Sequence, residues 1–113
     1  MEKEIEYYHT IDGKCPYFEW RKKLDVSIRL RVNKRIDKLK EGLYGDHKAL
    51  QNSKLSELRM DFGKGYRIYY YDLGSTVVLF ITGSDKKDQK KVIQQANEYF
   101  EDYIERNKNG NRK

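Results

Sequence analysis

The chain has 113 residues, which is enough for one domain with a single hydrophobic core and too few for two domains. Its 24 Lys and Arg against 18 Asp and Glu give a formal net charge of +6, which favours a polyanionic partner such as RNA, DNA or an acidic protein. The single cysteine, Cys15, excludes an internal disulfide, and the longest apolar run, 77–81, is too short to span a membrane. No apolar leader opens the chain, so the sequence predicts a cytoplasmic protein with no membrane partner.

The first part of the chain predicts a short strand followed by two helices. Residues 4–9 alternate loosely and are rich in Ile and Tyr, which is typical of a strand. Pro16 suits the first position of a helix, where its missing N–H would have no partner anyway. A second helix is predicted from Ser27, as N-cap, to Gly42, because apolar residues recur at every third or fourth position with basic residues between them. Two helices joined by so little chain form a helical hairpin.

The second part predicts a three-stranded meander and a last helix. After a loop at 44–54, the segments 56–62, 66–72 and 76–83 have the composition and spacing of successive antiparallel strands. Asp88 can cap a helix whose apolar positions are Val92, Ile93, Ala96, Phe100, Tyr103 and Ile104. The predicted order is β-α-α-β-β-β-α, an α+β domain with a mostly antiparallel sheet over 1–105, and 106–113 is predicted to be a disordered, polar and basic tail.

The hairpin around Gly63–Gly65 contains one arginine, Arg67, among tyrosines. A three-residue loop would pair Asp61 with Arg67 and Arg59 with Tyr69. Leu58, Met60, Phe62, Tyr66, Ile68 and Tyr70 would then face the helices, and Arg59, Asp61, Arg67, Tyr69 and Tyr71 would share the other, open face.

Two interpretations of Arg67 follow. In the first, it makes an ordinary cross-strand pair with Asp61. In the second, arginines and outward tyrosines form a platform for single-stranded RNA, with Lys86 and Lys87 at the end of the next strand.

Three segments favour the second interpretation. "SELRMDFGKGYRIYY" at 56–70, "VVLFITGSDKKDQKKVIQQA" at 77–96 and "LYGDHKAL" at 43–50 resemble the HigB-like branch of the RelE/ParE toxins of type II toxin–antitoxin systems, the addiction module killer proteins. The resemblance extends over nearly the whole chain. It implies a compact RelE-like α+β fold and a growth-arresting toxin that cleaves mRNA on the ribosome without metal or cofactor. It also implies a cognate antitoxin, typically a helix-turn-helix protein, through which the complex would contact operator DNA.

The resemblance implies roles for particular residues. Catalysis would fall to Arg67, Arg59 and Lys86, and RNA binding to Lys48 and Lys54. Apart from the resemblance, Tyr69, whose ring could stack on a base, and Lys87, next to Lys86, are further RNA-binding candidates. The sequence departs from the family pattern at Ser84, where a glycine is frequent, and at Val92, where an acidic residue is common.

The implied chemistry needs a proton acceptor, a proton donor and a group that stabilises charge on the phosphate. Arg67 suits the last role because its planar guanidinium stays protonated and matches phosphate oxygens. His47 and Asp85 are the acid/base candidates, with Lys86 as an alternative acid, although Asp85 is also placed to cap the final turn. No spacing typical of metal ligands is present, so no metal site is predicted.

Two other functions stay open. A ParE-like toxin would inhibit DNA gyrase by binding it, and a non-catalytic regulatory protein would bind nucleic acid without cutting it. The antitoxin would dock on the basic helices 28–41 and 88–105 or on the sheet face.

Overall fold

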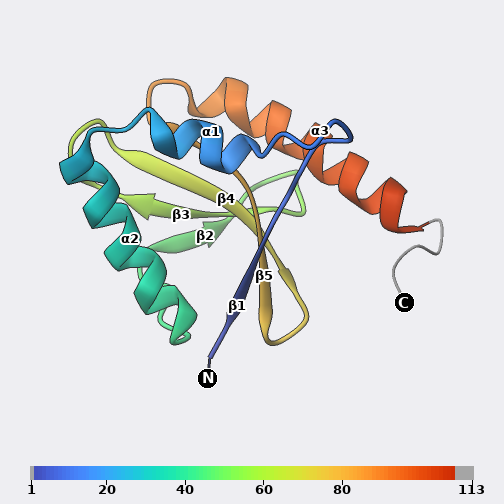
Figure 1. The fold of residues 1–113 in the computed structure, drawn as a ribbon, viewed down its shortest axis with the longest axis horizontal. Helices are drawn as coiled ribbons and strands as arrows, with labels where there is room; N and C mark the ends of the chain where they lie inside the picture. Colours follow the sequence, from blue (N-terminus) through green and yellow to red (C-terminus); the bar gives the residue numbers. More distant parts are fainter. Residues whose placement is uncertain (1, 109–113) are drawn as a thin grey trace.

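The computed structural model describes residues 2–108, which form one five-stranded sheet with helices on both faces (Figure 1). The strands are β1 Glu4–Tyr7, β2 His47–Ala49, β3 Ser56–Met60, β4 Tyr66–Leu73 and β5 Val77–Asp85. The helices are α1 Pro16–Lys22, α2 Val26–Lys40 and α3 Gln89–Lys108. The strand order is β1-β5-β4-β3-β2, and β1 runs parallel to β5 while the other neighbours are antiparallel. The predicted α+β class, with a mostly antiparallel sheet, is confirmed.

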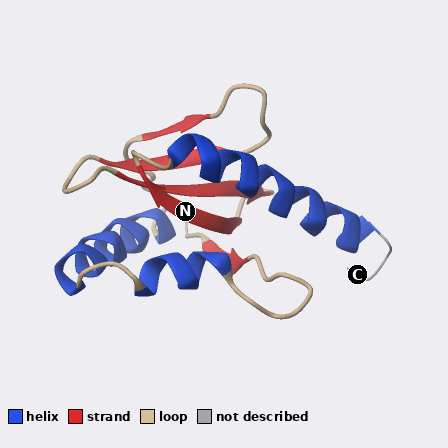
Figure 2. Ribbon diagram, turned by 90° about the horizontal axis from the view of Figure 1, so that it is seen from above, coloured by secondary structure: helices blue, strands red, loops and turns tan. Residues whose placement is uncertain are grey.

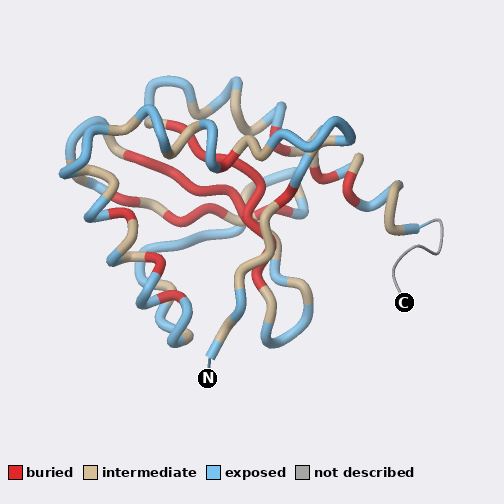
Figure 3. The backbone as a smooth tube through the Cα atoms, in the orientation of Figure 1, coloured by how far each residue is buried: buried red, intermediate tan, exposed pale blue. Residues whose placement is uncertain are grey.

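The two faces of the sheet carry separate hydrophobic clusters. On one face α1 and α2 pack their apolar positions, including Tyr17, Val32 and Leu39, against Leu58 and Ile68. On the other face α3 covers a second cluster, so the sheet is sandwiched between helices (Figure 2). Burial is therefore continuous over residues 66–70 of β4 and 78–84 of β5, the two central strands (Figure 3). Within the described residues, no helix is long and apolar enough to cross a membrane.

The strand β2 corrects the predicted element order, because 44–54 was expected to be a loop. All three β2 residues are exposed, and they pair with β3 in the register His47–Leu58, Lys48–Glu57 and Ala49–Ser56. An edge strand this short has no apolar alternation of its own. Its conformation is set by the backbone groups that β3 offers, and the local sequence therefore does not reveal it.

The predicted hairpin register is wrong by two residues. Met60 pairs with Tyr66 and Arg59 with Arg67, so the loop is 61–65 rather than three residues. Gly63 and Gly65 take positive φ angles of 55° and 75° in this loop. Because side chains alternate with a period of two, a slip of two residues leaves every side chain on its predicted face.

The second face of the sheet is not the open platform that the sequence suggested. Tyr69 has no exposed surface and belongs to the α3 cluster. Tyr71 is half-buried, with its ring centroid 4.6 Å from that of Phe100. The prediction that these two tyrosines look outward is therefore wrong, because α3 packs over them.

The helix boundaries agree with the predictions except at two ends. α1 begins at Pro16 as expected, whereas α2 begins at Val26 with Asp25 rather than Ser27 at the N-cap. The tail prediction is wrong for 106–108, since α3 continues to Lys108 and Arg106 donates hydrogen bonds to the Asp102 carboxylate and to the backbone carbonyl of His9. Residues 109–113 of that predicted tail lie outside the described residues.

The glycine at 83 is required by the close approach of α1 to β5. A Cβ atom at Gly83 would lie 2.5 Å from Cδ2 and Cε3 of Trp20, so the indole packs directly on the strand backbone. This contact holds α1 against the end of β5, where Ser84 stands opposite Arg67.

Candidate nucleic-acid interface

Arg67 lies near the end of the sheet where β3, β4 and β5 reach the loop 61–65. It stands opposite Arg59 on β3 and Ser84 on β5, and it is 6% exposed. Its Nη1 donates to the carbonyl of Tyr66 at 3.1 Å and lies 4.0 Å from the Asp61 carboxylate, whose side chain is 79% exposed. The guanidinium therefore sits in the protein interior and directs one end toward the surface.

Glu57 is a second buried charge beside Arg67, and sequence reasoning did not identify it as a site residue. Glu57 is 3% exposed, and its Oε1 lies 3.8 Å from Nε of Arg67. Neither of these two buried atoms has a hydrogen-bond partner within the described part of the chain. Buried charged groups with incomplete hydrogen bonding cost folding free energy, so the arrangement is unfavourable for stability alone. Such a cost is typical of functional sites.

Two arginines face each other across β3 and β4, and each has its own carboxylate. Arg59 donates from Nε and Nη2 to Oδ1 of Asp46 at 3.1 and 2.7 Å, whereas Arg67 pairs with Glu57. The hydrogen bond from Arg59 holds the pKa of Asp46 below its usual value. The Arg59 guanidinium is thus turned toward the start of β2, and the Asp46 carboxylate partly neutralises its charge. The predicted role of Arg59 as a catalytic cation on an open face does not match this arrangement.

Arg35 of α2 holds together the segment before β2 and the end of β3. Its guanidinium donates to the backbone carbonyls of Tyr44, Asp46 and Arg59 at 2.8, 2.6 and 2.6 Å. Burial lowers the pKa of Arg35. Because it satisfies carbonyls on two segments, Arg35 holds the start of β2 and the end of β3 in one position.

Exposed lysines lie on the segments that end near Arg67, and Lys86 is the one shown beside it. Lys86 and Lys87 follow β5, Lys64 lies in the loop 61–65, and all three side chains are exposed. A Cβ atom at Gly65 would lie 3.3 Å from Cβ of Lys86 and 4.0 Å from Nη1 of Arg67, so the glycine lets these two groups come close together. The predicted association of Arg67 with Lys86 at neighbouring strand ends is present.

Lys48 and Lys54, the two lysines assigned to RNA binding, occupy different places. Lys48 is exposed on β2 directly opposite Glu57, on the same face as Arg67. Lys54 precedes β3 at the other end of that strand, where it lines a groove with Asn97 and Glu101 of α3. The structure therefore brings Lys48 near Arg67 and separates Lys54 from it.

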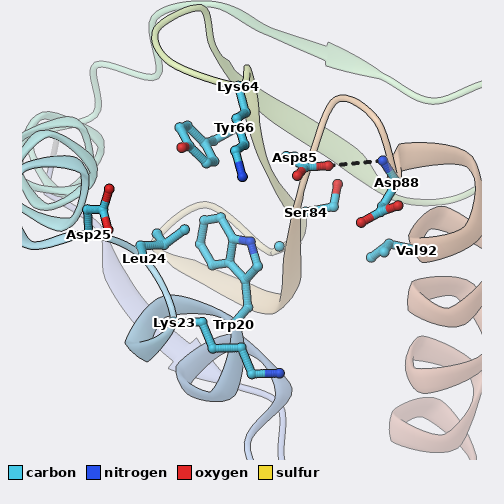
Figure 4. A pocket seen from close by; sticks show the side chains of 11 residues that line it. Trp20, Lys23, Leu24, Asp25, Lys64, Tyr66, Ser84, Asp85, Asp88 and Val92 are labelled. Carbon is cyan, nitrogen blue, oxygen red and sulfur yellow. Dashed lines mark hydrogen bonds between the residues drawn. The ribbon is translucent and has the colours of Figure 1, made fainter.

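The acid/base candidates lie on the opposite face from Arg67. His47 pairs with Leu58, and its Nδ1 lies 2.8 Å from the carbonyl of Gly45. Asp85 pairs with Tyr66, and its Oδ1 accepts the backbone N–H of Asp88 at 3.0 Å, which is the predicted capping contact (Figure 4). Neither side chain shares a site with Arg67.

Tyr69 supports the interior of the site instead of offering a stacking surface. Its hydroxyl lies 2.8 Å from Oγ of Ser84, and burial raises its pKa to about 12. A ring with no exposed surface cannot stack on a base, so its predicted RNA-binding role requires correction. Within residues 2–108, no three His, Cys, Asp or Glu side chains come close enough to hold a metal ion.

Comparisons with known proteins add one relative. No protein-family model matches the chain. A protein of Haemophilus influenzae Rd, described as uncharacterized, is 38% identical over 78 residues, which cover 68% of this chain and 78% of that protein. The chain therefore belongs to the same family as this Haemophilus protein.

Proposed function

We propose that the chain is the toxin of a type II toxin–antitoxin system, of the RelE/ParE kind, and that it cleaves mRNA on the ribosome without a metal ion. The observation that carries the proposal is Arg67, a buried arginine beside Glu57 whose Nη1 end lies near the exposed Lys86 and Asp61. A guanidinium placed in this way suits a phosphate group. The cytoplasm is the compartment that this function requires.

The reaction is an attack by the ribose 2′-oxygen on the adjacent phosphorus. An O–P bond forms at the 2′-oxygen as the bond from phosphorus to the 5′-oxygen breaks, which leaves a 2′,3′-cyclic phosphate and a 5′-hydroxyl. In this proposal Nη1 of Arg67 binds the phosphate where the Asp61 carboxylate now lies 4.0 Å away. The guanidinium then stabilises the negative charge that grows on the phosphate oxygens.

Two carboxylates flank Arg67, and their exposure suggests different roles. Glu57 is buried within 3.8 Å of Nε, so it orients the guanidinium and is a positioning residue. Asp61 is exposed at the other end of the guanidinium, where it can accept the proton of the 2′-hydroxyl. Lys86, exposed beside the same end, can donate a proton to the leaving 5′-oxygen.

A partner is part of the proposal, because a free toxin of this kind would stop the growth of its own host. The partner would be an antitoxin with an acidic segment that covers the basic surface around Arg67. Contact with operator DNA would occur through the complex.

The test uses expression of the chain without a partner, growth measurements, and mapping of transcript ends by primer extension. We expect growth arrest and new transcript ends that depend on translation. Lys86→Ala, an exposed position that leaves the fold intact, should reduce the frequency of these ends about 10²-fold or more. Lys22→Ala, which removes an exposed lysine on α1 with a side chain 64% exposed, is the matched control and should behave as wild type.

Two outcomes would replace the proposal. Intact transcripts together with inhibition of gyrase supercoiling by the purified protein would assign the ParE-like function. No toxicity and no cleavage, with operator binding retained, would assign the regulatory one.

A further inference from the structure

A cavity of about 320 Å³ opens at the end of β5, next to the Arg67 site but on the side of α1 (Figure 4). β1 pairs with β5 only as far as Phe80, and the end of β5 beyond it, residues 83–85, forms the floor of the cavity. The walls come from the end of α1, the loop 61–65 and the start of α3. Its volume is in the range of small-ligand sites.

The cavity presents an aromatic surface. The indole of Trp20 is half-buried and packs against the backbone of Gly83 on one side, so its remaining exposed surface faces the cavity. Figure 4 shows this indole in the middle of the lining side chains, with Lys64 and Tyr66 on one side and Asp85 and Asp88 on another. An accessible indole face offers a stacking surface for a planar ring.

The polar groups of the cavity are of two kinds. Carboxylates come from Asp25, Asp85 and Asp88, and ammonium groups come from Lys23 and Lys64. Because Asp85 already accepts the backbone N–H of Asp88, the Asp88 carboxylate is the better placed acceptor for a ligand N–H. Lysines at the rim suit phosphates on either side of a bound ring.

The cavity and the proposed reaction site lie on opposite faces of the sheet and meet at the end of β5. Ser84 lines the cavity, bonds to Tyr69 and stands opposite Arg67 on the neighbouring strand. Lys64, which lines the cavity, is next to Gly65 in the same loop, and Gly65 lies close to both Lys86 and Arg67. A strand of RNA with one base in the cavity would therefore pass around the end of the sheet to place a phosphate at Arg67.

We propose that this cavity binds one nucleobase of the substrate RNA, stacked on Trp20, and selects a base with an exocyclic amino group. Cytosine, adenine and guanine can donate such an amino hydrogen to the Asp88 carboxylate. Uracil presents only carbonyl oxygens at the corresponding position and is rejected by the carboxylate. This inference rests on the proposed function for its substrate, but it concerns binding and not cleavage.

The test uses the fluorescence of Trp20, the single tryptophan of the chain, as a direct reporter of the cavity. The purified protein is titrated with the trinucleotides CpCpC and UpUpU, which differ at each base only at position 4, amino against carbonyl, and at N3, which carries a hydrogen only in uracil. Free N-acetyltryptophanamide corrects for absorption by the ligand. We expect saturable quenching by CpCpC with an apparent Kd about tenfold lower than for UpUpU.

Variants separate the two features of the cavity. Asp88→Asn should reduce the preference for CpCpC to less than twofold, because an amide can serve either base. Lys64→Gln should weaken both trinucleotides equally. Asp37→Asn, which removes an exposed carboxylate on α2, is the matched control and should keep the full preference.

Absence of saturable quenching by either trinucleotide, or equal affinities that Asp88→Asn leaves unchanged, would overturn the inference. Cleavage of mRNA without quenching would overturn this inference and leave the proposed function standing. Quenching with the expected preference but without cleavage would support the cavity and remove the endonuclease proposal.

Discussion

The buried pair of Glu57 and Arg67 makes a quantitative prediction for stability. Their side chains are 4% and 8% exposed, and the two nearest charged atoms are 3.8 Å apart. Removing one member of a buried pair leaves an uncompensated charge in the interior, which costs about 3–5 kcal/mol. Nε of Arg67 and Oε1 of Glu57 also lack hydrogen bonds, so the pair is weaker than a hydrogen-bonded pair and the loss should lie at the lower end of this range. We therefore expect Glu57→Leu to lower the free energy of unfolding by about 3 kcal/mol.

The double variant Glu57→Leu/Arg67→Leu separates charge from packing. It leaves no buried charge, so we expect it to recover most of the loss and to be close to wild type in stability. Urea denaturation followed by circular dichroism of four proteins, the wild type, the single variants Glu57→Leu and Arg67→Leu, and the double variant, gives a double-mutant cycle. Glu19→Leu, which breaks an exposed pair with Lys22, is the control and should change stability little. A double variant whose loss equals the sum of the two single losses would refute the reasoning.

Three further predictions concern the frame of the site. Arg35→Lys should lower the free energy of unfolding by about 2 kcal/mol in urea denaturation, since a lysine cannot reach all three carbonyls, and an unchanged midpoint would contradict this. Gly83→Ala should cost about 1–3 kcal/mol and shift the emission of Trp20, because the new Cβ overlaps the indole, whereas Gly74→Ala, with open space around it, should leave the emission unchanged. Burial raises the pKa of Tyr69 to about 12, above the value near 10 of an unfolded tyrosine, so its contribution to stability is complete below about pH 10 and is lost as pH rises toward 12. Tyr69→Phe should therefore flatten the decline of unfolding free energy between about pH 10 and 12, and an equally steep decline in the variant would exclude this cause.

Much of the fold was predictable because its elements carry their own periodicity. Leu58, Ile68 and Tyr70 alternate with polar residues, and this pattern placed them correctly against the helices even though the register was wrong by two residues. The strand β2 was not predictable, since its exposed residues carry no pattern and pair only because β3 is beside them.

The site was predictable in part. The position of Arg67 beside Lys86 followed from the strand order, which local patterns establish. The burial of Arg67 and the role of Glu57 did not follow, because a polar residue on the second face of a sheet is expected to meet solvent. Here α3 covers that face, and this helix begins 22 positions after Arg67 in the sequence (89 against 67).

The most direct test of the central claim is the chemistry of the RNA ends produced in a purified translation system. The account predicts that wild-type protein yields mRNA fragments with 2′,3′-cyclic phosphate and 5′-hydroxyl ends. It also predicts that Arg67→Lys, which keeps the charge beside Glu57 but loses the planar fork, yields at least about 10²-fold fewer fragments while remaining folded. Fragments with 3′-hydroxyl ends, or an Arg67→Lys protein as active as wild type, would contradict it.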